Sequence, residues 1–141
     1  VVENPLIFDG ERFRMDFEDL ERKLDDSSVK MVFLCSPHNP GGRVWTREEL
    51  EKFASICASR GVIVVSDEIH CDVLFRGTKH TPLAAVSDEI AKLTITTVAP
   101  SKTFNIAGLA TAAVIIPYIA RGCTIGNGQV RIPGCIRRTT K

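Results

Sequence analysis

The fold is decided by residues 46–70, TREELEKFASICASRGVIVVSDEIH, which hold the pattern of a helix followed by that of a strand. Thr46 and Glu49 have the spacing of a capping box, in which each side chain accepts a hydrogen bond from the other residue's backbone N–H. Apolar residues then follow at helical spacing: Leu50, Phe53, Ala54 and Cys57. Gly61 suits a helix end, so the pattern predicts a helix over about 47–59 and a buried strand over 62–66.

Similar patterns occur on both sides of this segment. Apolar and β-branched runs predict strands over 31–35, 94–98 and 110–116, and short amphipathic patterns with capping residues predict helices over about 16–24 and 87–93. Strands that alternate with helices are joined by right-handed crossovers, which make neighbouring strands parallel. The sequence therefore predicts an α/β fold with a mainly parallel sheet and flanking helices.

Three polar residues, Asn39, Asp67 and Lys102, each lie just past the end of a predicted strand. In an open α/β sheet, ligands bind at the carboxyl ends of parallel strands, so an amide, a carboxylate and an amine could meet there on one small molecule. These groups match the needs of pyridoxal phosphate. Its aldehyde takes a lysine amine, its pyridine nitrogen needs an anionic partner, and its phenolic oxygen accepts hydrogen bonds.

A family resemblance rests on three segments: SPHNPGGRVW (36–45), SDEIH (66–70) and SKTFNIAGL (101–109). They resemble the signatures of fold-type I pyridoxal-phosphate enzymes of the class I/II aminotransferase family. The nearest branch is that of cystathionine β-lyase and related carbon–sulfur lyases, in which histidine commonly follows Asp-Glu-Ile. The similarity runs from about residue 4 to 117, and it implies that residues 1–117 form the central part of the large domain, an αβα sandwich.

The resemblance implies cofactor contacts for four residues. It makes Lys102 the catalytic lysine on the aldehyde and Asp67 the partner of the pyridine nitrogen. It places Asn39 and His70 on the phenolic oxygen. Each residue also has a plainer alternative, namely an exposed lysine, a helix-capping aspartate, a turn asparagine and a packed histidine.

The phosphate contacts are less well defined by the resemblance. Ser101 or Thr103 could hydrogen-bond the phosphate, and plain loop hydroxyls are the alternative. Ala110 stands where aminotransferases have an arginine, which favours the lyase branch. The family pattern also implies a cis bond before Pro40 and an antiparallel strand over 110–116, beside the lysine strand.

The implied reaction is a β-elimination from an amino-acid substrate, in which the Lys102 amine removes the Cα proton and a thiolate leaves Cβ. Aminotransfer is the alternative, because both reactions pass through a carbanion. A noncatalytic remnant is a third possibility, because the chain covers well under half of a family chain and lacks the Gly-rich phosphate loop and the substrate-binding arginine. The resemblance implies that the parent enzyme is a homodimer.

Two other kinds of site fit the sequence poorly. Strand 62–66 with its Asp-Glu resembles the magnesium-binding strand of a nucleotide triphosphatase, but the chain has no G-x-x-x-x-G-K-[ST] loop. A metal site built from Asp67, His70, Cys71 and Asp72 lacks a second cluster that would complete it, so no metal is expected.

Composition bounds the partners and the location. The 141 residues are 44% hydrophobic and 25% charged with a formal net charge of +1, which gives no reason to expect nucleic acid or an anionic membrane as partner. No apolar run approaches the ~18 residues of a membrane span, and no secretion signal is apparent, so a cytoplasmic location is expected. The five cysteines form no CxxC pair and are expected to be free thiols.

Residues 118–141 differ from the rest of the chain. They contain four glycines, no acidic residue and no amphipathic period, and they do not match the family. Such a segment cannot pack much core, so an aberrant or disordered terminus is expected rather than a functional basic arm.

Overall fold

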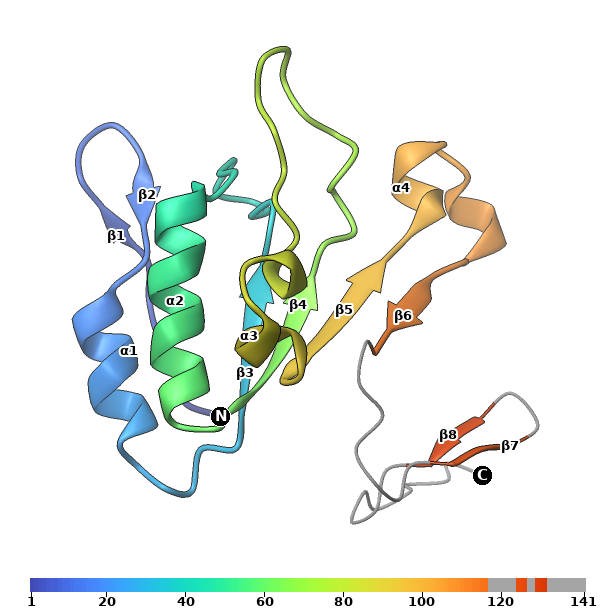
Figure 1. The fold of residues 1–141 in the computed structure, drawn as a ribbon. Coiled ribbons are helices and arrows are strands. Elements are labelled where there is room, and N and C mark those ends of the chain that lie inside the picture. Colours follow the sequence, from blue (N-terminus) through green and yellow to red (C-terminus); the bar gives the residue numbers. More distant parts are fainter. Residues whose placement is uncertain (117–123, 127–128, 132–141) are drawn as a thin grey trace.

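The computed structural model describes residues 1–116, 124–126 and 129–131. Its centre is a four-stranded sheet in the order β3–β4–β5–β6 (Figure 1). β3 (Met31–Cys35), β4 (Ile63–Asp67) and β5 (Thr94–Val98) are parallel, and β6 (Ala113–Ile115) runs antiparallel to β5. The predicted α/β fold and the antiparallel direction of the last strand are confirmed.

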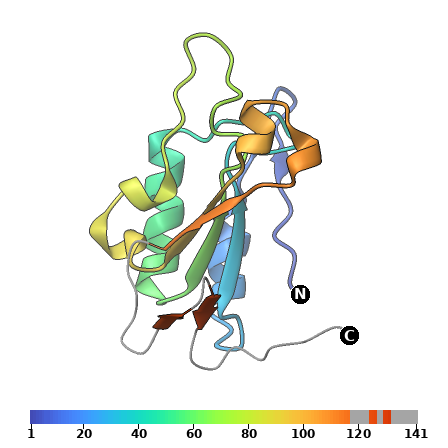
Figure 2. The ribbon, with the colours of Figure 1, turned by 90° about the vertical axis from the view of Figure 1, so that its right-hand side faces the viewer.

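Helices cover one face of this sheet. α2 (Arg47–Ser59) connects β3 to β4, and η1 (Leu83–Ala85) and α3 (Asp88–Ala91) connect β4 to β5. Both connections step in the same direction across the sheet, so right-handed crossovers place these helices on the same face (Figure 2). α1 (Phe17–Leu24) packs beside α2. The opposite face is open in the described part of the chain, and Phe33 on it is 76% exposed.

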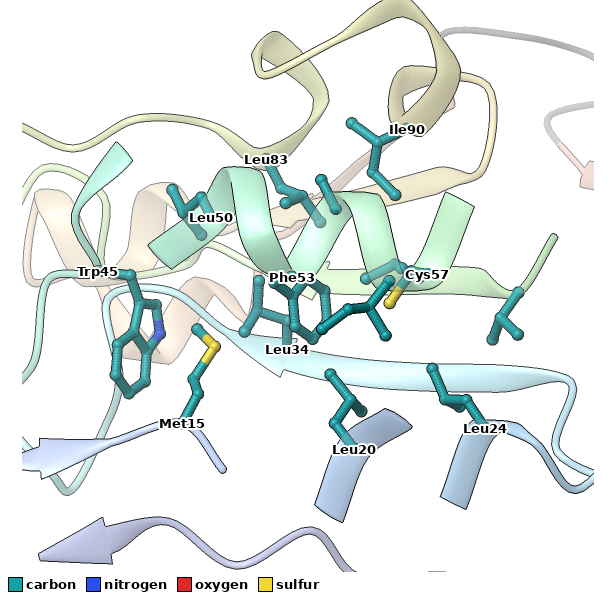
Figure 3. Packing of buried hydrophobic residues seen from close by; sticks show 14 residues of the cluster. Met15, Leu20, Leu24, Leu34, Trp45, Leu50, Phe53, Cys57, Leu83 and Ile90 are labelled. Atoms are coloured by element: carbon teal, nitrogen blue, oxygen red, sulfur yellow. The ribbon is translucent and has the colours of Figure 1, made fainter. Parts of the chain in front are cut away.

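The hydrophobic core lies between the sheet and these helices (Figure 3). The four apolar residues that predict α2 are all buried, and they pack with side chains from α1, β3 and β4: Leu50, Phe53, Ala54 and Cys57. Burial raises the pKa of the Cys57 thiol to about 12. Cys35, Cys57 and Cys71, the cysteines in the described part of the chain, are free thiols as predicted.

The helix ends follow the predicted capping residues. The Thr46 hydroxyl accepts a hydrogen bond from the backbone N–H of Glu49 at 3.2 Å, and the Glu49 carboxylate accepts one from the N–H of Thr46 at 2.8 Å. This capping box starts α2 at the predicted residue. Side chains also cap α1, through Asp16, and α3, through Ser87.

Five short elements within residues 1–116 are not predicted by the sequence patterns: β1 (Ile7–Phe8), β2 (Phe13–Arg14), η1, α4 (Pro100–Thr103) and η2 (Ala107–Leu109). α3 is shorter than the predicted helix 87–93 because the carbonyl of Leu93 already accepts a sheet hydrogen bond from Val64 N at 2.9 Å. The last strand begins later than residue 110 because Ala110 has a left-handed backbone, with φ 46°.

β7 (Thr124–Gly126) and β8 (Gln129–Arg131) form a separate antiparallel pair. The prediction made for residues 118–141 otherwise falls outside the described part of the chain. Among the helices that the structure describes, none is long and apolar enough to cross a membrane.

Candidate active site

The carboxyl ends of the three parallel strands meet at one edge of the sheet. Cys35, Asp67 and Thr97 are in register on neighbouring strands. Their side chains project from the open face, because the alternating neighbours on the same strands are buried under the helices: Leu34, Ser66 and Thr96. The strand ends therefore present a thiol, a carboxylate and a hydroxyl on the same side.

Asp67 is oriented by two hydrogen bonds on one oxygen. Its Oδ1 accepts from Thr97 Oγ1 at 3.2 Å and from the backbone N–H of Ile69 at 3.3 Å. The chain after β4 forms turns rather than a helix, so Asp67 caps no helix. The sequence patterns do not predict a role for Thr97, because its partner Asp67 lies thirty residues away in the chain.

Asn39 lies in a tight turn after β3. The bonds Ser36–Pro37 and Asn39–Pro40 are both cis, so the cis bond implied before Pro40 is confirmed. His38 closes the turn, since its N–H donates to Arg43 O at 2.7 Å and its ring Nδ1 accepts from Gly41 N at 3.1 Å. A Cβ at Gly41 would lie 2.6 Å from that ring nitrogen, so a larger residue there would displace the His38 ring. The side chain of Asn39 is left exposed at the tip.

Arg43 and Trp45 tie this turn to the start of α2. The Arg43 guanidinium is buried and pairs with both carboxylate oxygens of Glu49 at 2.8 Å. It also lies 4.8 Å from the centre of the Trp45 ring, whose Nε1 donates to Cys35 O at 2.8 Å. These supports were not predicted, although both residues belong to the motif that includes Asn39.

His70 and Asn39 line the same cavity, which has a volume of about 260 Å³. The cavity lies between the turn after β3 and the loop after β4, and its lining residues are Pro37, His38, Asn39, Pro40, Gly42, Arg43, Val44, His70, Val73, Leu74 and Phe75. The structure thus brings together two of the predicted site residues. Asp67, Ser101 and Lys102 do not line this cavity, and they lie elsewhere on the same sheet edge.

Lys102 lies in α4, the short helix that directly follows β5, and its side chain is exposed. Ser101 is half-buried beside it. The next residue, Thr103, donates from Oγ1 to Asp72 Oδ2 at 2.7 Å, which ties α4 to the loop after β4. The lysine segment and the segment that follows Asp67 are therefore neighbours at the same end of the sheet.

A metal site at these residues has no support in the geometry. In the part of the chain that the structure describes, no group of three or more His, Cys, Asp or Glu side chains is placed to hold a metal ion. Asp72 instead accepts the hydrogen bond from Thr103, and Asp67 faces Thr97.

Comparison with known proteins shows the family of the chain. Residues 5–124 match the family described as aminotransferase class I and II. The chain is 54% identical over 117 residues to cystathionine beta-lyase PatB of Bacillus subtilis strain 168, covering 83% of the chain and 30% of that lyase. The chain belongs to the class I and II aminotransferase family.

Solved structures of family members have the same fold in this region. Cystalysin from Treponema denticola, which contains a pyridoxal 5'-phosphate cofactor, superposes with a TM-score of 0.80 at 40% identity, over 82% of this chain and 29% of cystalysin. N-succinyldiaminopimelate aminotransferase from Mycobacterium tuberculosis has a TM-score of 0.75 at 33% identity, over 80% of this chain and 29% of that enzyme. The chain thus spans less than a third of the length of the family members it matches.

Proposed function

We propose that this chain is part of a pyridoxal-phosphate enzyme that acts on amino acids, and that its reaction is the β-elimination of a carbon–sulfur lyase. The observation that supports the proposal is that Asn39, Asp67, His70 and Lys102 all lie at the same edge of the sheet, inside the segment that matches the family. The similarity to PatB and cystalysin supports a lyase reaction.

The groups present on this edge suit the cofactor. Oδ1 of Asp67 takes both hydrogen bonds that the described residues give this carboxylate, which leaves Oδ2 for a protonated ring nitrogen. Asn39 and His70 supply an amide and an imidazole for a phenolic oxygen, and Ser101 supplies a hydroxyl for a phosphate. Pyridoxal phosphate, when bound, supplies an electron sink for the negative charge that develops at the substrate Cα.

Each of these residues would then have a separate role in the reaction. Asp67 keeps a positive charge on the ring nitrogen, and the Thr97 hydroxyl holds the carboxylate in place. The Lys102 amine holds the cofactor before the substrate arrives and afterwards takes the Cα proton. The proposal includes an amino-acid substrate and a homodimeric enzyme, as the family resemblance implies, and the cytoplasmic location that the sequence patterns lead us to expect.

Aminotransfer is the second candidate reaction. The likeness to N-succinyldiaminopimelate aminotransferase favours it. Ala110, at the position where the resemblance expects an aminotransferase arginine, favours the lyase. The test uses the encoded protein, including any sequence that flanks residues 1–141. This protein should release pyruvate from cystathionine faster than it transfers the amino group of cystathionine to 2-oxoglutarate. The opposite order of rates would make aminotransfer the function.

The lysine is the first residue to test. Borohydride reduction of the encoded protein with pyridoxal phosphate, followed by peptide mass mapping, should place the pyridoxyl mass on Lys102. Lys102→Ala should abolish the visible absorbance of the bound cofactor. Lys92→Arg is the matched control, because Lys92 is an exposed lysine that precedes β5 at its opposite end. A label on any other lysine would refute the proposed function.

A further inference from the structure

A buried polar cluster lies on the helix-covered side of the sheet, behind the candidate active site. Its centre is Glu68, which follows Asp67 and is only 2% exposed. One carboxylate oxygen, Oε1, accepts from Ser66 Oγ at 2.8 Å and from the backbone N–H of Leu83 at 3.0 Å. The other oxygen lies 2.8 Å from Nε2 of His80. A buried carboxylate is stable only when hydrogen-bond donors of this kind surround it, so the burial of Glu68 depends on these three partners.

His80 has one hydrogen bond in the described part of the chain. Its side chain is only 8% exposed, and its Nδ1 is buried without a partner among the described residues. A carboxylate can only accept, so Nε2 of His80 is the donor to Glu68. The orientation of the ring is therefore set by Glu68.

The cluster closes the base of a long loop. Glu68 stands at the start of the connection from β4 to η1, and His80 and Leu83 stand at its end. The loop over residues 69–79 extends between these points without helix or strand (Figure 1). Three hydrophobic residues of this loop and His70 form one wall of the 260 Å³ cavity that Asn39 also lines.

Glu68 also links the two faces of the sheet at the carboxyl end of β4. Glu68 continues the sheet ladder, because its N–H donates to Thr97 O at 2.9 Å. Its side chain points to the helix side, whereas the side chain of Asp67 points to the open side. Anchoring Glu68 therefore restricts how the strand end can rotate, and with it the direction of Asp67.

We propose that Glu68 and His80 are positioning residues, whose hydrogen bond holds loop 69–79 and thereby places His70 across the cavity from Asn39. The part of this inference that concerns the cofactor rests on the proposed function. A purely structural pair would contribute to the free energy of unfolding and would leave the position of the loop unchanged.

Two amide substitutions at His80 separate these roles. In His80→Gln the amide nitrogen lies near the position of Nε2 and can still donate to Glu68. In His80→Asn the amide lies near Nδ1 and cannot reach. Thr94→Val is the control, because it removes another buried hydrogen bond, from Thr94 Oγ1 to Ile90 O at 2.7 Å, at the opposite end of β5.

Limited chymotrypsin digestion of the cofactor-free encoded protein tests the loop. Phe75 on the loop is 90% exposed, so cleavage after it reports how far the loop opens. His80→Asn should be cleaved there about tenfold faster than the wild type, the factor expected for one lost hydrogen bond. His80→Gln and Thr94→Val should stay within about threefold of the wild type. Equal cleavage of His80→Asn and His80→Gln would overturn the proposal.

A fluorescence titration with pyridoxal phosphate tests the site. His80→Asn should raise the dissociation constant about tenfold, and His80→Gln should restore it to within about threefold of the wild type. Faster cleavage of His80→Asn with unchanged affinity would refute the positioning of the cofactor site. If the wild type binds no pyridoxal phosphate, the proposed function fails, and the cleavage rates alone decide whether Glu68 and His80 hold the loop.

Discussion

Asp67 combines a rigid orientation with a free acceptor. Both hydrogen bonds that the described residues give its carboxylate, from Thr97 and from the backbone of Ile69, fall on Oδ1. Thr97 lies on the neighbouring strand β5 and Ile69 lies in the loop after β4, so the direction of the other oxygen is set by the sheet and the loop together. A group held in this way is suited to pair with one charged atom of a ligand.

Replacing this carboxylate should therefore affect turnover much more than folding. Asp67→Asn keeps an oxygen for Thr97 and Ile69, so the free energy of unfolding should change by less than ~1 kcal/mol. The amide cannot hold the ring nitrogen as a cation, and turnover should fall by on the order of 10^2 to 10^4. Steady-state kinetics and urea unfolding of the encoded protein measure the two effects.

Thr97→Val is the matched control for this substitution. It removes one donor to Asp67 but leaves the charge, so turnover should fall by less than about tenfold. Wild-type turnover in Asp67→Asn would rule out its cofactor role, even if Lys102 carries the pyridoxyl label.

His38 gives the turn after β3 a dependence on pH. Burial lowers the pKa of His38 below its ordinary value, and the neutral ring accepts a hydrogen bond from Gly41. The unfolded chain then binds more protons than the folded chain below pH about 6.5, so the stability from this residue is lost as the pH falls through the folded pKa.

We expect the His38 ring to titrate by NMR with a midpoint below about 6.5. His38→Asn places an amide oxygen near Nδ1 and does not titrate. In urea unfolding, this variant should therefore lose less stability than the wild type between neutral and acidic pH. A midpoint at or above the ordinary value would contradict the buried, accepting ring.

At the scale of elements, the start of α2 and the turn that includes Asn39 share one residue. Glu49 accepts the capping hydrogen bond from Thr46 and also pairs with Arg43. The helix end and the turn are therefore stabilised together. This explains how a turn with an exposed tip can hold Asn39 in a defined place.

Breaking the cap should lower the stability of the folded chain. Thr46→Ala removes the hydroxyl that accepts from Glu49 N and should lower the free energy of unfolding by about 1 kcal/mol. Thr46→Ser keeps the oxygen, so its free energy of unfolding should lie within about 0.3 kcal/mol of the wild type. Thermal or urea unfolding measures both. Equal losses in the two variants would mean that the threonine methyl group matters more than the cap.

At the scale of the whole molecule, one face of the sheet is not covered by other elements in the described part of the chain. Met31, Phe33 and Ile63 lie on the open face and are 43%, 76% and 39% exposed. Exposed apolar side chains gathered on one face of a folded domain mark an interaction surface. The short length relative to PatB agrees with this observation, because the chain covers 30% of that lyase.

A chain of residues 1–141 alone should be catalytically silent. Its cavity at the sheet edge has a volume of about 260 Å³, and neither Asp67 nor Lys102 is among the residues that line it. Rate depends on groups that are held in closely defined positions around the substrate, and their mere presence is not enough. The purified chain should release no measurable pyruvate from cystathionine under conditions in which PatB does. Pyruvate release would show that the site is more complete than its described residues indicate.

Much of the fold follows from the sequence alone. Helix 47–59 and strands 31–35 and 94–98 have the predicted bounds, because periodicity and capping involve residues only a few positions apart. The places of Asn39 and Lys102 beyond the strand ends could be predicted for the same reason, whereas Asp67 is the last residue of β4, which runs one position later than the predicted strand 62–66. α4 could not be predicted, since it has only four residues and, unlike α3, no capping side chain that would mark its start.

The tertiary structure alone decided which distant side chains meet. Thr97 with Asp67 and Thr103 with Asp72 lie about thirty residues apart, and His80 is twelve residues from Glu68. These pairs depend on strand register and on the closure of a long loop, which no local pattern contains. A strand alternates its faces, so adjacent acids with nearly the same sequence context, Asp67 and Glu68, end on opposite sides of the sheet.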